Sequence, residues 1–409
     1  MPANKIIPEN KNKLLVCSQL FYPELISTGQ TLTELCEELS EMGIDIEVLC
    51  GPMTLVDRKS KTPKEIIYKK IKIKRVWGTR FPKINLLGKF LNHLTFMLSI
   101  FFYLIKDKTQ RPMLVLTNPP LLGFIIALIT KNPIIFLVFD VYPETIVECG
   151  LLPKNSFIVK LWHKMNSYIL SKARDIIVIG RFMQERLEKN MSAKNISKIK
   201  NIHVWCDDRN IHYIAKSSNP LIKEWKLENK FIVLYSGNMG RFHDLETILS
   251  SAKELKNNPK IAFVFVGEGH KKSWAQKFAS ENNLANCQFH TYVPREKLSE
   301  VLSLADVGLV SLVKGQEGLS VPSKTFGLLA TARPVIAIMN KKAEIARIVK
   351  EENCGILVSP GEIKPLSEAI TKLSKNSELS KTLGQNGKKA LIRKYSLKKA
   401  AEAYKDLIT

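Results

Sequence analysis

The sequence predicts an α/β protein with two doubly wound domains in tandem, each built on a parallel sheet. Its 409 residues suit two domains, at about 100–200 residues each. Short apolar runs alternate with helical patterns along the chain, which is typical of parallel strands that helices cover on both faces. The alternation restarts after residues 215–229, a polar segment without a strand signal. We therefore expect an N-terminal domain at 1–215, a C-terminal domain at 216–385 and, at 386–409, a helix that packs back on the N-terminal domain.

The strands of both domains follow from their apolar runs. In the N-terminal half we expect them at 14–18, 44–50, 113–117, 134–139 and 175–179, with an acidic amphipathic helix at 30–42. In the C-terminal half we expect them at 231–236, 261–266, 288–292, 307–312 and 334–338. The last segment, 378–408, has a helical period, with a break expected at Gly384 and Gly387. Two such domains would form a ligand cleft between them, at the carboxyl ends of both sheets.

Composition excludes several classes of protein. Hydrophobic residues make up 45% of the chain and charged residues 24%, which is ordinary for a globular protein and excludes a disordered or fibrous one. The seven cysteines are scattered and form no CxxC pair, so neither a disulfide framework nor a thiolate zinc site is indicated. The first residues lack the apolar run of a signal peptide. These features favour a reduced, cytoplasmic protein.

The charge of the chain is basic and uneven. Formal net charge is +24, and residues 55–83 hold eleven Lys and Arg against two acids. Residues 84–105 then form an apolar stretch with Lys89 as its one charge. One interpretation is a core helix beside a solvated basic loop. We favour the other, in which segment 55–108 rests on the anionic inner face of the plasma membrane.

This membrane hypothesis can be tested on Phe96, Leu98 and Phe101. If the helix is exposed, polar substitutions there should release the protein from vesicles, whereas in a core helix they should unfold it. A nucleic-acid partner is not expected, because the basic run has few interleaved aromatic residues and matches no nucleic-acid motif.

Two loops of the C-terminal half suit a diphosphate. The turn YSGNMGRFHDLE holds Gly237 and Gly240, which let a ligand approach the backbone, and Arg241, which offers a forked donor for phosphate oxygens. The segment GQEGLSVPSKTFG places Lys324 at the start of a helix, where a cation is unfavourable unless an anion is bound beside it.

Two loops of the N-terminal half have candidate polar groups. Thr28 and Gly29 lie at the predicted start of the first helix, where free N–H groups favour an anion or hydroxyl, although a plain helix cap fits equally. Asp140 and Glu144 follow a buried strand, so their carboxylates should face the cleft unless they only cap the next helix. The histidines show no metal-ligand spacing, and His243 is interpreted as a helix-surface residue.

Together these segments resemble the retaining, nucleotide-sugar-dependent glycosyltransferases of family 4, which have two Rossmann-like domains in the GT-B arrangement. The resemblance covers nearly the whole chain and is strongest in DVYPETIVECGLL, YSGNMGRFHDLETIL and EGLSVPSKTFGLLATARPVIAI. It is closest to members that transfer a sugar to a lipid-linked acceptor, such as the amino-deoxysugar and colanic-acid-type transferases. It implies a hexosyl or N-acetylaminosugar transferase of cell-surface polysaccharide assembly, with a nucleotide-sugar donor, expected to be UDP-linked, and no metal cofactor.

The resemblance also implies roles for individual residues. Arg241 and Lys324 would neutralise the diphosphate, and Glu317 would contact the transferred sugar. Asp140, counted among the catalytic residues, would match the acidic residue of the family's His-Asp pair in the first domain. The implied donor-binding residues are Gly29, Gly237, Asn238, Gly240, Gly267, Val293, Ser320, Val321, Pro322 and Ser323, with Val293 in the Tyr292–Pro294 turn that would frame the base. The expected acceptor-binding residues are Thr28, Tyr142 and Glu144.

Three positions depart from the family pattern. Gly327 stands where a second glutamate usually grips the ribose, and Phe139 stands where a histidine precedes the first-domain acid. A basic residue usually found after the arginine is replaced by His243 or Asp244. These departures keep two alternatives open: a catalytically inactive binding protein of the same fold, and a sugar-nucleotide epimerase, which would need no acceptor.

Overall fold

A computed structural model describes residues 12–24, 27–53, 63–81, 86–189 and 191–409. The chain divides into two compact units, Met1–His203 with Leu397–Thr409 and Val204–Ser396. The first division therefore falls at residue 203, before the polar segment in which we expected it, and the return to the N-terminal unit falls at 397. The chain segments just inside these two boundaries lie side by side in the second unit, where the backbone N–H of Cys206 donates to the carbonyl of Tyr395 at 3.2 Å.

The N-terminal unit is built on an eight-stranded sheet of order β3-β4-β2-β1-β5-β6-β7-β8. The strands are β1 Lys13–Cys17, β2 Asp45–Cys50, β3 Glu65–Tyr68, β4 Ile71–Arg75, β5 Met113–Leu116, β6 Ile134–Val138, β7 Asp175–Val178 and β8 Ile199–Asn201. All neighbours are parallel except β3 and β4. The five expected strands are present, while β3, β4 and β8 were missed. In β4, Ile71 and Ile73 are buried and alternate with lysines, so part of the basic segment is an edge hairpin and not a loop.

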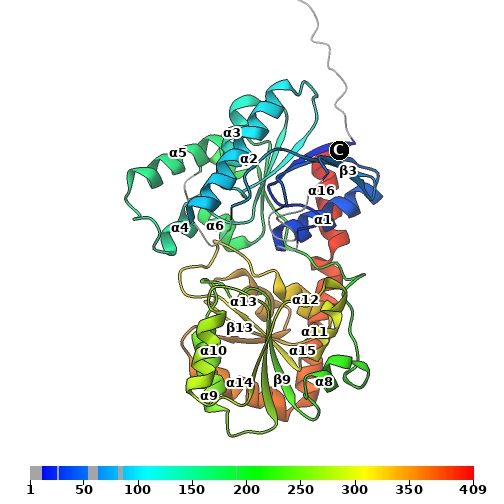
Figure 1. Cartoon of the computed structure of the whole chain (residues 1–409), viewed down its shortest axis with the longest axis vertical. Coiled ribbons are helices and arrows are strands. Elements are labelled where there is room, and N and C mark those ends of the chain that lie inside the picture. The colour runs from blue at the N-terminus through cyan, green and yellow to red at the C-terminus, as the bar shows by residue number, and fades with distance from the viewer. Residues whose placement is uncertain (1–11, 25–26, 54–62, 82–85, 190) are drawn as a thin grey trace, which may run out of the picture. The chain divides into compact units, whose positions relative to one another are not determined.

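The helices of this unit divide between the two faces of the sheet. They are α1 Ser27–Glu41, α2 Leu86–Lys106, α3 Leu122–Ile129, α4 Glu144–Glu148, α5 Phe157–Lys172, α6 Arg181–Glu188, α7 Ala193–Ile196 and α16 Leu397–Ile408. The connection from β1 to β2 runs in one direction across the sheet, and the connections from β4 through β5 and β6 to β7 run in the other. Because such crossovers are right-handed, α2, α3 and α5 share one face, and α1 lies on the opposite face together with α16, which packs on it (Figure 1).

Helix α2 has an inward stripe at every fourth position. Phe96, Ile100 and Leu104 are buried, and Asn92 at the same spacing bonds the backbone of Phe81 through both its amide N and O at 2.9 Å. Within the described residues, α2 is the one helix that is long and apolar enough to cross a membrane by length and composition, with mean hydropathy 1.3. Phe96 was therefore a wrong choice of exposed residue, because it belongs to the core, while Leu98 is exposed.

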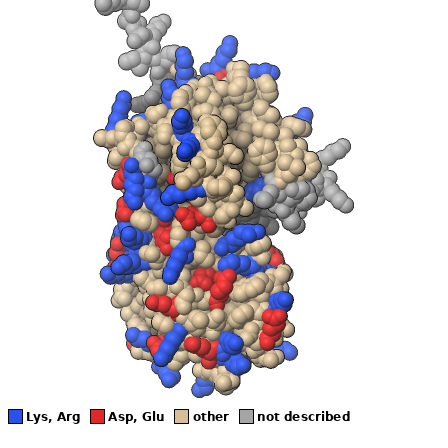
Figure 2. All heavy atoms as spheres, turned by 90° about the vertical axis from the view of Figure 1, so that its left-hand side faces the viewer, with Lys and Arg blue, Asp and Glu red and all other residues tan. Residues whose placement is uncertain are grey.

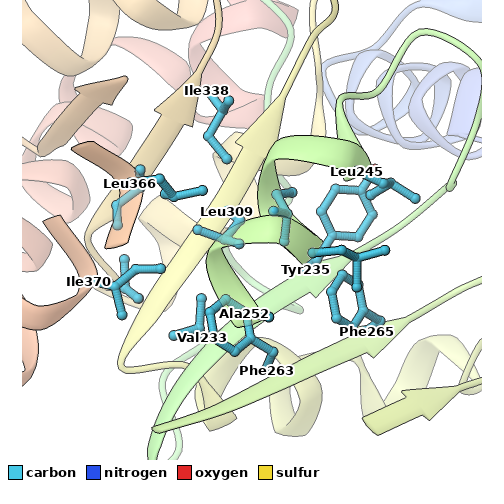
Figure 3. Close-up of a cluster of buried hydrophobic side chains, with 14 of the residues drawn as sticks. Val233, Tyr235, Leu245, Ala252, Phe263, Phe265, Leu309, Ile338, Leu366 and Ile370 are labelled. Atoms are coloured by element: carbon cyan, nitrogen blue, oxygen red, sulfur yellow. The ribbon is translucent and has the colours of Figure 1, made fainter. Parts of the chain in front are cut away.

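The C-terminal unit is built on a six-stranded parallel sheet of order β11-β10-β9-β12-β13-β14. The strands are β9 Phe231–Ser236, β10 Ile261–Val266, β11 Cys287–His290, β12 Val307–Ser311, β13 Val335–Ile338 and β14 Gly355–Val358, of which β14 was not predicted. Chain order reverses between the neighbours β9 and β12, which defines a switch point of the kind where α/β sheets bind ligands. Buried side chains of the sheet, such as Val233, Phe263 and Leu309, pack against Leu366 and Ile370 in the core (Figure 3).

The helices of this unit cover both faces of its sheet. They are α8 Pro220–Glu224, α9 Leu245–Glu254, α10 Lys272–Glu281, α11 Leu298–Leu304, α12 Lys324–Ala330, α13 Glu344–Glu351, α14 Ile363–Lys375 and α15 Ser377–Ala390, with short helical turns at Lys216–Ser218, Arg295–Lys297 and Leu391–Tyr395. The break expected at Gly384 and Gly387 is wrong, because α15 continues through both. A Cβ on Gly384 would lie 2.1 Å from the carbonyl oxygen of Ala332, and one on Gly387 2.8 Å from Leu329. These glycines let α15 pack closely on α12 and the turn after it.

Candidate active site

The loops that follow β9 and β12 meet at the switch point of the C-terminal unit. Gly237, directly after β9, has φ +128°, and its N–H donates to the carbonyl of Val266 at 2.8 Å. A Cβ at this position would lie 3.3 Å from Cε of Lys324, the first residue of α12. The structure therefore brings together the glycine turn and the lysine that the sequence singled out in separate segments.

The ammonium group of Lys324 is buried without a partner. Its Nζ is shielded from solvent and has no hydrogen-bond acceptor among the described residues, although the residue as a whole is only half-buried. It lies 3.8 Å from the centroid of the Tyr235 ring, a cation–π contact. Burial lowers the pKa of Lys324 from its ordinary value of 10.5 to about 7. A buried cation without a counter-charge is costly, so this position is suited to an anionic ligand.

His243 lies beside this lysine and is not the helix-surface residue that we expected. Its Nδ1 is 2.8 Å from the carbonyl oxygen of Ser311, which requires a proton on Nδ1, and its ring meets Tyr235 edge to face. Burial, and then the charge of Lys324, lower the pKa of His243 to about 3. The imidazole is thus neutral, so the positive charge of this corner belongs to Lys324. Asp244, the next residue, caps α9 by accepting from the N–H of Thr247.

Glycines also keep the backbone of the neighbouring β10 loop close to this turn. A Cβ on Gly267 would lie 2.1 Å from the carbonyl oxygen of Gly237, and one on Gly269 2.6 Å from Oδ1 of Asn238. The same Cβ on Gly267 would lie 3.4 Å from the ring of Tyr292, which is 55% exposed and is followed by the half-buried Val293. An exposed aromatic face therefore lies at one end of the glycine turn and Lys324 at the other.

The remaining donor-side residues occupy the same two loops. Arg241 is exposed and, within the described part of the chain, forms no ion pair or hydrogen bond through its guanidinium, so it can reorient towards a ligand. Glu317 is buried, and its Oε2 accepts from the N–H of Gly315 at 2.9 Å. Four further candidates lie between Glu317 and Lys324, with Pro322 buried and Ser320, Val321 and Ser323 half-buried. Gly240 packs beside Asn238 in the first loop.

Gly327 has a structural role that the sequence did not indicate. It is buried in α12, and a Cβ there would lie 2.9 Å from Leu302 of α11. A glutamate at this position would collide with the neighbouring helix in this packing. The departure from the family pattern at 327 therefore falls at a buried position where glycine lets α12 pack close to Leu302.

In the N-terminal unit, Asp140, Tyr142 and Glu144 line one cavity of about 70 Å³ at the carboxyl end of β6. Thr117, at the end of β5, accepts from the N–H groups of Phe139 at 3.2 Å and Asp140 at 3.3 Å through its hydroxyl oxygen. Burial raises the pKa of Asp140 to about 6, with a smaller opposing effect of Lys89. This carboxyl group therefore titrates near neutral pH, in the range of a useful acid or base.

Helix α5 lines the cavity with six residues that the sequence reasoning missed, namely Trp162, His163, Asn166, Ser167, Ile169 and Leu170. Trp162 stacks on Tyr142 with ring centroids 5.9 Å apart, and Asn166 donates to the carbonyl of Tyr142. Nε1 of Trp162 and Oε2 of Glu144 are buried without a partner among the described residues. The one-turn spacing of Trp162 and Asn166 was the available signal. The cavity lining thus includes one N–H donor and one carboxylate oxygen that have no hydrogen-bond partner among the described residues.

Thr28 and Gly29 lie in the first turn of α1, as expected, but not in this cavity. The carbonyl of Gly29 accepts from the hydroxyl of Thr33 at 2.7 Å, and a Cβ on Gly29 would meet Glu24 at 3.5 Å. Across the described residues, no group of three His, Cys, Asp or Glu side chains is arranged to hold a metal ion, and a metal-free reaction stays a prediction.

The two α/β units, with a buried lysine at a glycine turn, are those of a GT-B glycosyltransferase. The family model of the glycosyl transferases group 1 matches residues 217–390. WbjE of Pseudomonas aeruginosa, named a glycosyltransferase, is 32% identical over 305 residues, which cover 72% of this chain and 74% of WbjE. The chain belongs to the group 1 glycosyltransferases.

Other known proteins agree with this assignment. WcaI of Escherichia coli K12, named a colanic acid biosynthesis glycosyl transferase, is 25% identical over 88% of this chain and 91% of WcaI. Sucrose-phosphate synthase from Thermosynechococcus elongatus has the same fold, with a TM-score of 0.78 at 17% identity, over 97% of this chain and 98% of the synthase. HepE from Anabaena, solved in complex with UDP-glucose, has a TM-score of 0.72 at 12% identity, over 97% of this chain and 98% of HepE.

Proposed function

We propose that this glycosyltransferase moves a sugar, with retention of anomeric configuration, from a UDP-sugar to a lipid-linked saccharide in cell-surface polysaccharide assembly. The observation that carries the donor half of the proposal is the buried, unpartnered ammonium of Lys324 against Gly237. A diphosphate placed there would receive a charge-assisted hydrogen bond from Nζ and leave the cation paired. HepE, which has the same fold, was solved with UDP-glucose, and this supports uridine as the base.

The residues of the C-terminal unit then divide the chemistry among them. The acceptor oxygen bonds to the anomeric carbon as the bond from that carbon to the diphosphate breaks, and the diphosphate leaves with the electron pair. Lys324, held in place beside Tyr235, stabilises the developing negative charge. Arg241 adds a second donor when its side chain rotates towards the diphosphate. Glu317 would hold the transferred sugar, and Tyr292 would stack on the base.

The N-terminal cavity would receive the acceptor. Asp140 can accept the proton of an acceptor hydroxyl, because its pKa of about 6 leaves it ionised at neutral pH yet basic enough to bind a proton. Tyr142 and Glu144 would position the saccharide, with Trp162 donating from Nε1. WcaI is named for colanic acid biosynthesis, and this supports a saccharide acceptor of a cell-surface polymer.

Retention and acceptor class need a product analysis. Incubation with a UDP-sugar and a lipid-linked acceptor, followed by NMR of the new linkage, should give the anomeric configuration of the donor. An inverted product would contradict the retaining proposal. Product from the nucleotide sugar alone, without acceptor, would instead favour epimerase chemistry.

The donor site can be tested first by binding. UDP, GDP, ADP and dTDP are compared for thermal stabilisation of wild type, Lys324→Ala and the exposed control Lys253→Ala. UDP at about 100 times its dissociation constant should stabilise wild type and the control by about 2.7 kcal/mol. The Lys324→Ala shift should be at least several-fold smaller, and its transfer activity should be lost with the fold intact.

Two results would go against this assignment. Near-wild-type turnover of Lys324→Ala would remove the lysine from the reaction. A wild-type protein that no nucleotide stabilises would instead favour an inactive member of the family.

For location, we propose that the protein works in the cytoplasm on the inner face of the plasma membrane. The net charge of +24 and the apolar exposed side of α2 support this proposal. Residues 54–62 and 82–85 of the expected membrane segment lie outside the described part of the chain.

A further inference from the structure

Helix α2 has a second apolar stripe, on the side away from the core. The stripe recurs every three to four residues, with exposed fractions between 37% and 64%, at Leu87, Phe90, Leu94, Leu98, Phe102 and Ile105. Together with the buried stripe, they make the helix apolar on two sides. A surface helix of a soluble domain is usually polar on its outer side, so this stripe calls for a partner.

A second apolar group lies on α5 and the segment before it. Phe157 is 78% exposed, Ile158 56% and Leu161 41%, and Leu151 before the helix is 52% exposed. Leu128 of α3, at 53%, adds a residue from the helix between them. Helix α3 packs against both α2 and α5, and all three cover the same face of the sheet (Figure 1). The exposed residues of α2, α3 and α5, with Leu151, therefore form one outer surface, which we call the three-helix face.

The charges on the three-helix face all have one sign. Helices α2, α3 and α5 contain no Asp or Glu, while α2 holds Lys89 and Lys106 and α5 holds Lys160, Lys164 and Lys172. Most of these lysines are exposed, and Figure 2 shows the N-terminal unit from a side that is largely uncharged, with Lys and Arg scattered over it. Large exposed apolar side chains among lysines suit the headgroup and acyl boundary of an anionic bilayer. A second copy of the same face would instead bring lysines against lysines.

We propose that the three-helix face docks on an anionic lipid bilayer, with α5 as much a part of the contact as α2. This goes beyond the segment 55–108, because α5 and α3 lie outside it. It rests on the proposed function in one respect, the acceptor role of the cavity. Trp162 and Asn166 of α5 line that cavity, and Trp162 is one turn from the exposed Ile158 and adjacent to the exposed Leu161. Docking through α5 places the cavity beside the lipid headgroups, where a lipid-linked saccharide presents its polar end.

The test is co-sedimentation of the full chain with vesicles of phosphatidylcholine alone or mixed with phosphatidylglycerol. Wild type should pellet with the mixed vesicles and stay in solution with the neutral ones. Phe157→Ser with Ile158→Ser, and separately Phe90→Ser with Phe102→Ser, should each weaken binding by roughly tenfold or more. Lys160→Gln with Lys164→Gln should weaken binding to the mixed vesicles by removing part of the attraction to their anionic headgroups. The control is Ile392→Ser, a 56% exposed residue of the C-terminal unit, which should bind as wild type does.

Folding and donor binding are measured on every variant by thermal unfolding with and without UDP. The donor site lies in the C-terminal unit, so loss of vesicle binding with an intact UDP response supports the proposal. The proposal is overturned if wild type does not bind the mixed vesicles, or if the α5 variant binds as wild type. It is also overturned if wild type dimerises in solution and the variants do not, since the face then serves a second copy. A failure of donor binding with intact vesicle binding would instead count against the proposed function alone.

Discussion

For the single residue Lys324, burial and positive charge oppose each other, because burial disfavours the charged form. Its Nζ has no hydrogen-bond partner among the described residues, and the pKa of the lysine is about 7. In the unfolded chain the same group titrates near 10.5. Between these values the unfolded state binds more protons than the folded state, so this group makes the free energy of unfolding rise as pH increases from about 7 to 10.5.

Nucleoside diphosphate binding should therefore depend on pH. The bound anion favours the charged lysine, so binding takes up a proton above the pKa of about 7, and affinity should fall by up to tenfold per pH unit above it. Isothermal titration of UDP in buffers of different ionisation enthalpy measures this uptake directly. In Lys324→Met the uptake should vanish, and the unliganded variant at pH 7 should be more stable by about 1–3 kcal/mol, less any lost contact with Tyr235. Equal proton uptake in wild type and variant would show that another group titrates.

Among single residues, the sequence motifs predicted which residues lie close together but not which contacts surround them. Gly237 and Lys324 were both selected from the sequence, and the structure puts them in contact. The environment of His243 could not be predicted from the same motif, because its ring bonds the carbonyl of Ser311 in β12, 68 residues away in the sequence. Trp162 and Asn166 were missed, because their one-turn spacing, the one local signal, is equally typical of a helix face that packs in the core.

At the scale of elements, α15 shows how glycine can serve packing inside a helix. Glycine normally lowers helix stability, and this predicted a break that does not exist. The distances from Gly384 to the Ala332 carbonyl and from Gly387 to Leu329 show that a side chain would push α15 away from its neighbours. The local cost of glycine is offset by close contact with another element. The residues of that element are far away in the sequence, so the local helical pattern does not reveal the contact.

Gly384→Ala should therefore destabilise the protein in spite of the better helix propensity of alanine. Overpacking typically costs about 1–3 kcal/mol, against about 1 kcal/mol gained from propensity, and backbone is harder to displace than a side chain. We expect a net loss of about 1–2 kcal/mol by denaturant unfolding, while Lys381→Ala, exposed on the same helix, should change little. A Gly384→Ala variant more stable than wild type would mean that α15 moves aside at no cost.

Whether a strand was predicted depended on how fully it is buried. The long apolar runs of the two sheets were found because a strand buried on both faces is apolar throughout. The missed strands are the edge strands β3, β8 and β14, and β4 next to β3. Each is short and partly exposed, and β3 and β4 lie in a lysine-rich stretch.

At the scale of the whole molecule, the chain leaves the N-terminal unit and returns to it. Helix α16 packs on α1, and Leu397, Ala400, Ala401, Tyr404 and Ile408 are its buried residues. The last residues of the chain thus complete the first unit, which residues 204–396 interrupt.

Deletion of 397–409 should consequently destabilise the N-terminal unit selectively. Five buried side chains, of which Leu397, Tyr404 and Ile408 are large, represent several kcal/mol of burial, at about 1.5–3 kcal/mol for each large one. Calorimetry should show a lowered transition for the unit without α16 and an unchanged UDP-dependent transition for the other. Loss of both transitions would show that the units unfold together, and an unchanged profile would show that α16 adds no stability.

The sequence by itself determined the fold class, the glycosyltransferase family and the loops that form the candidate donor site, because these depend on periodicity and on motifs that are contiguous in the chain. Tertiary structure decided which of those residues meet, which glycines serve packing and which apolar residues of α2 face outward. It also joined α5 to α2 in one basic, apolar surface. Such features arise from the crossover direction of parallel strands and from burial by distant elements, which bring together residues far apart in the sequence.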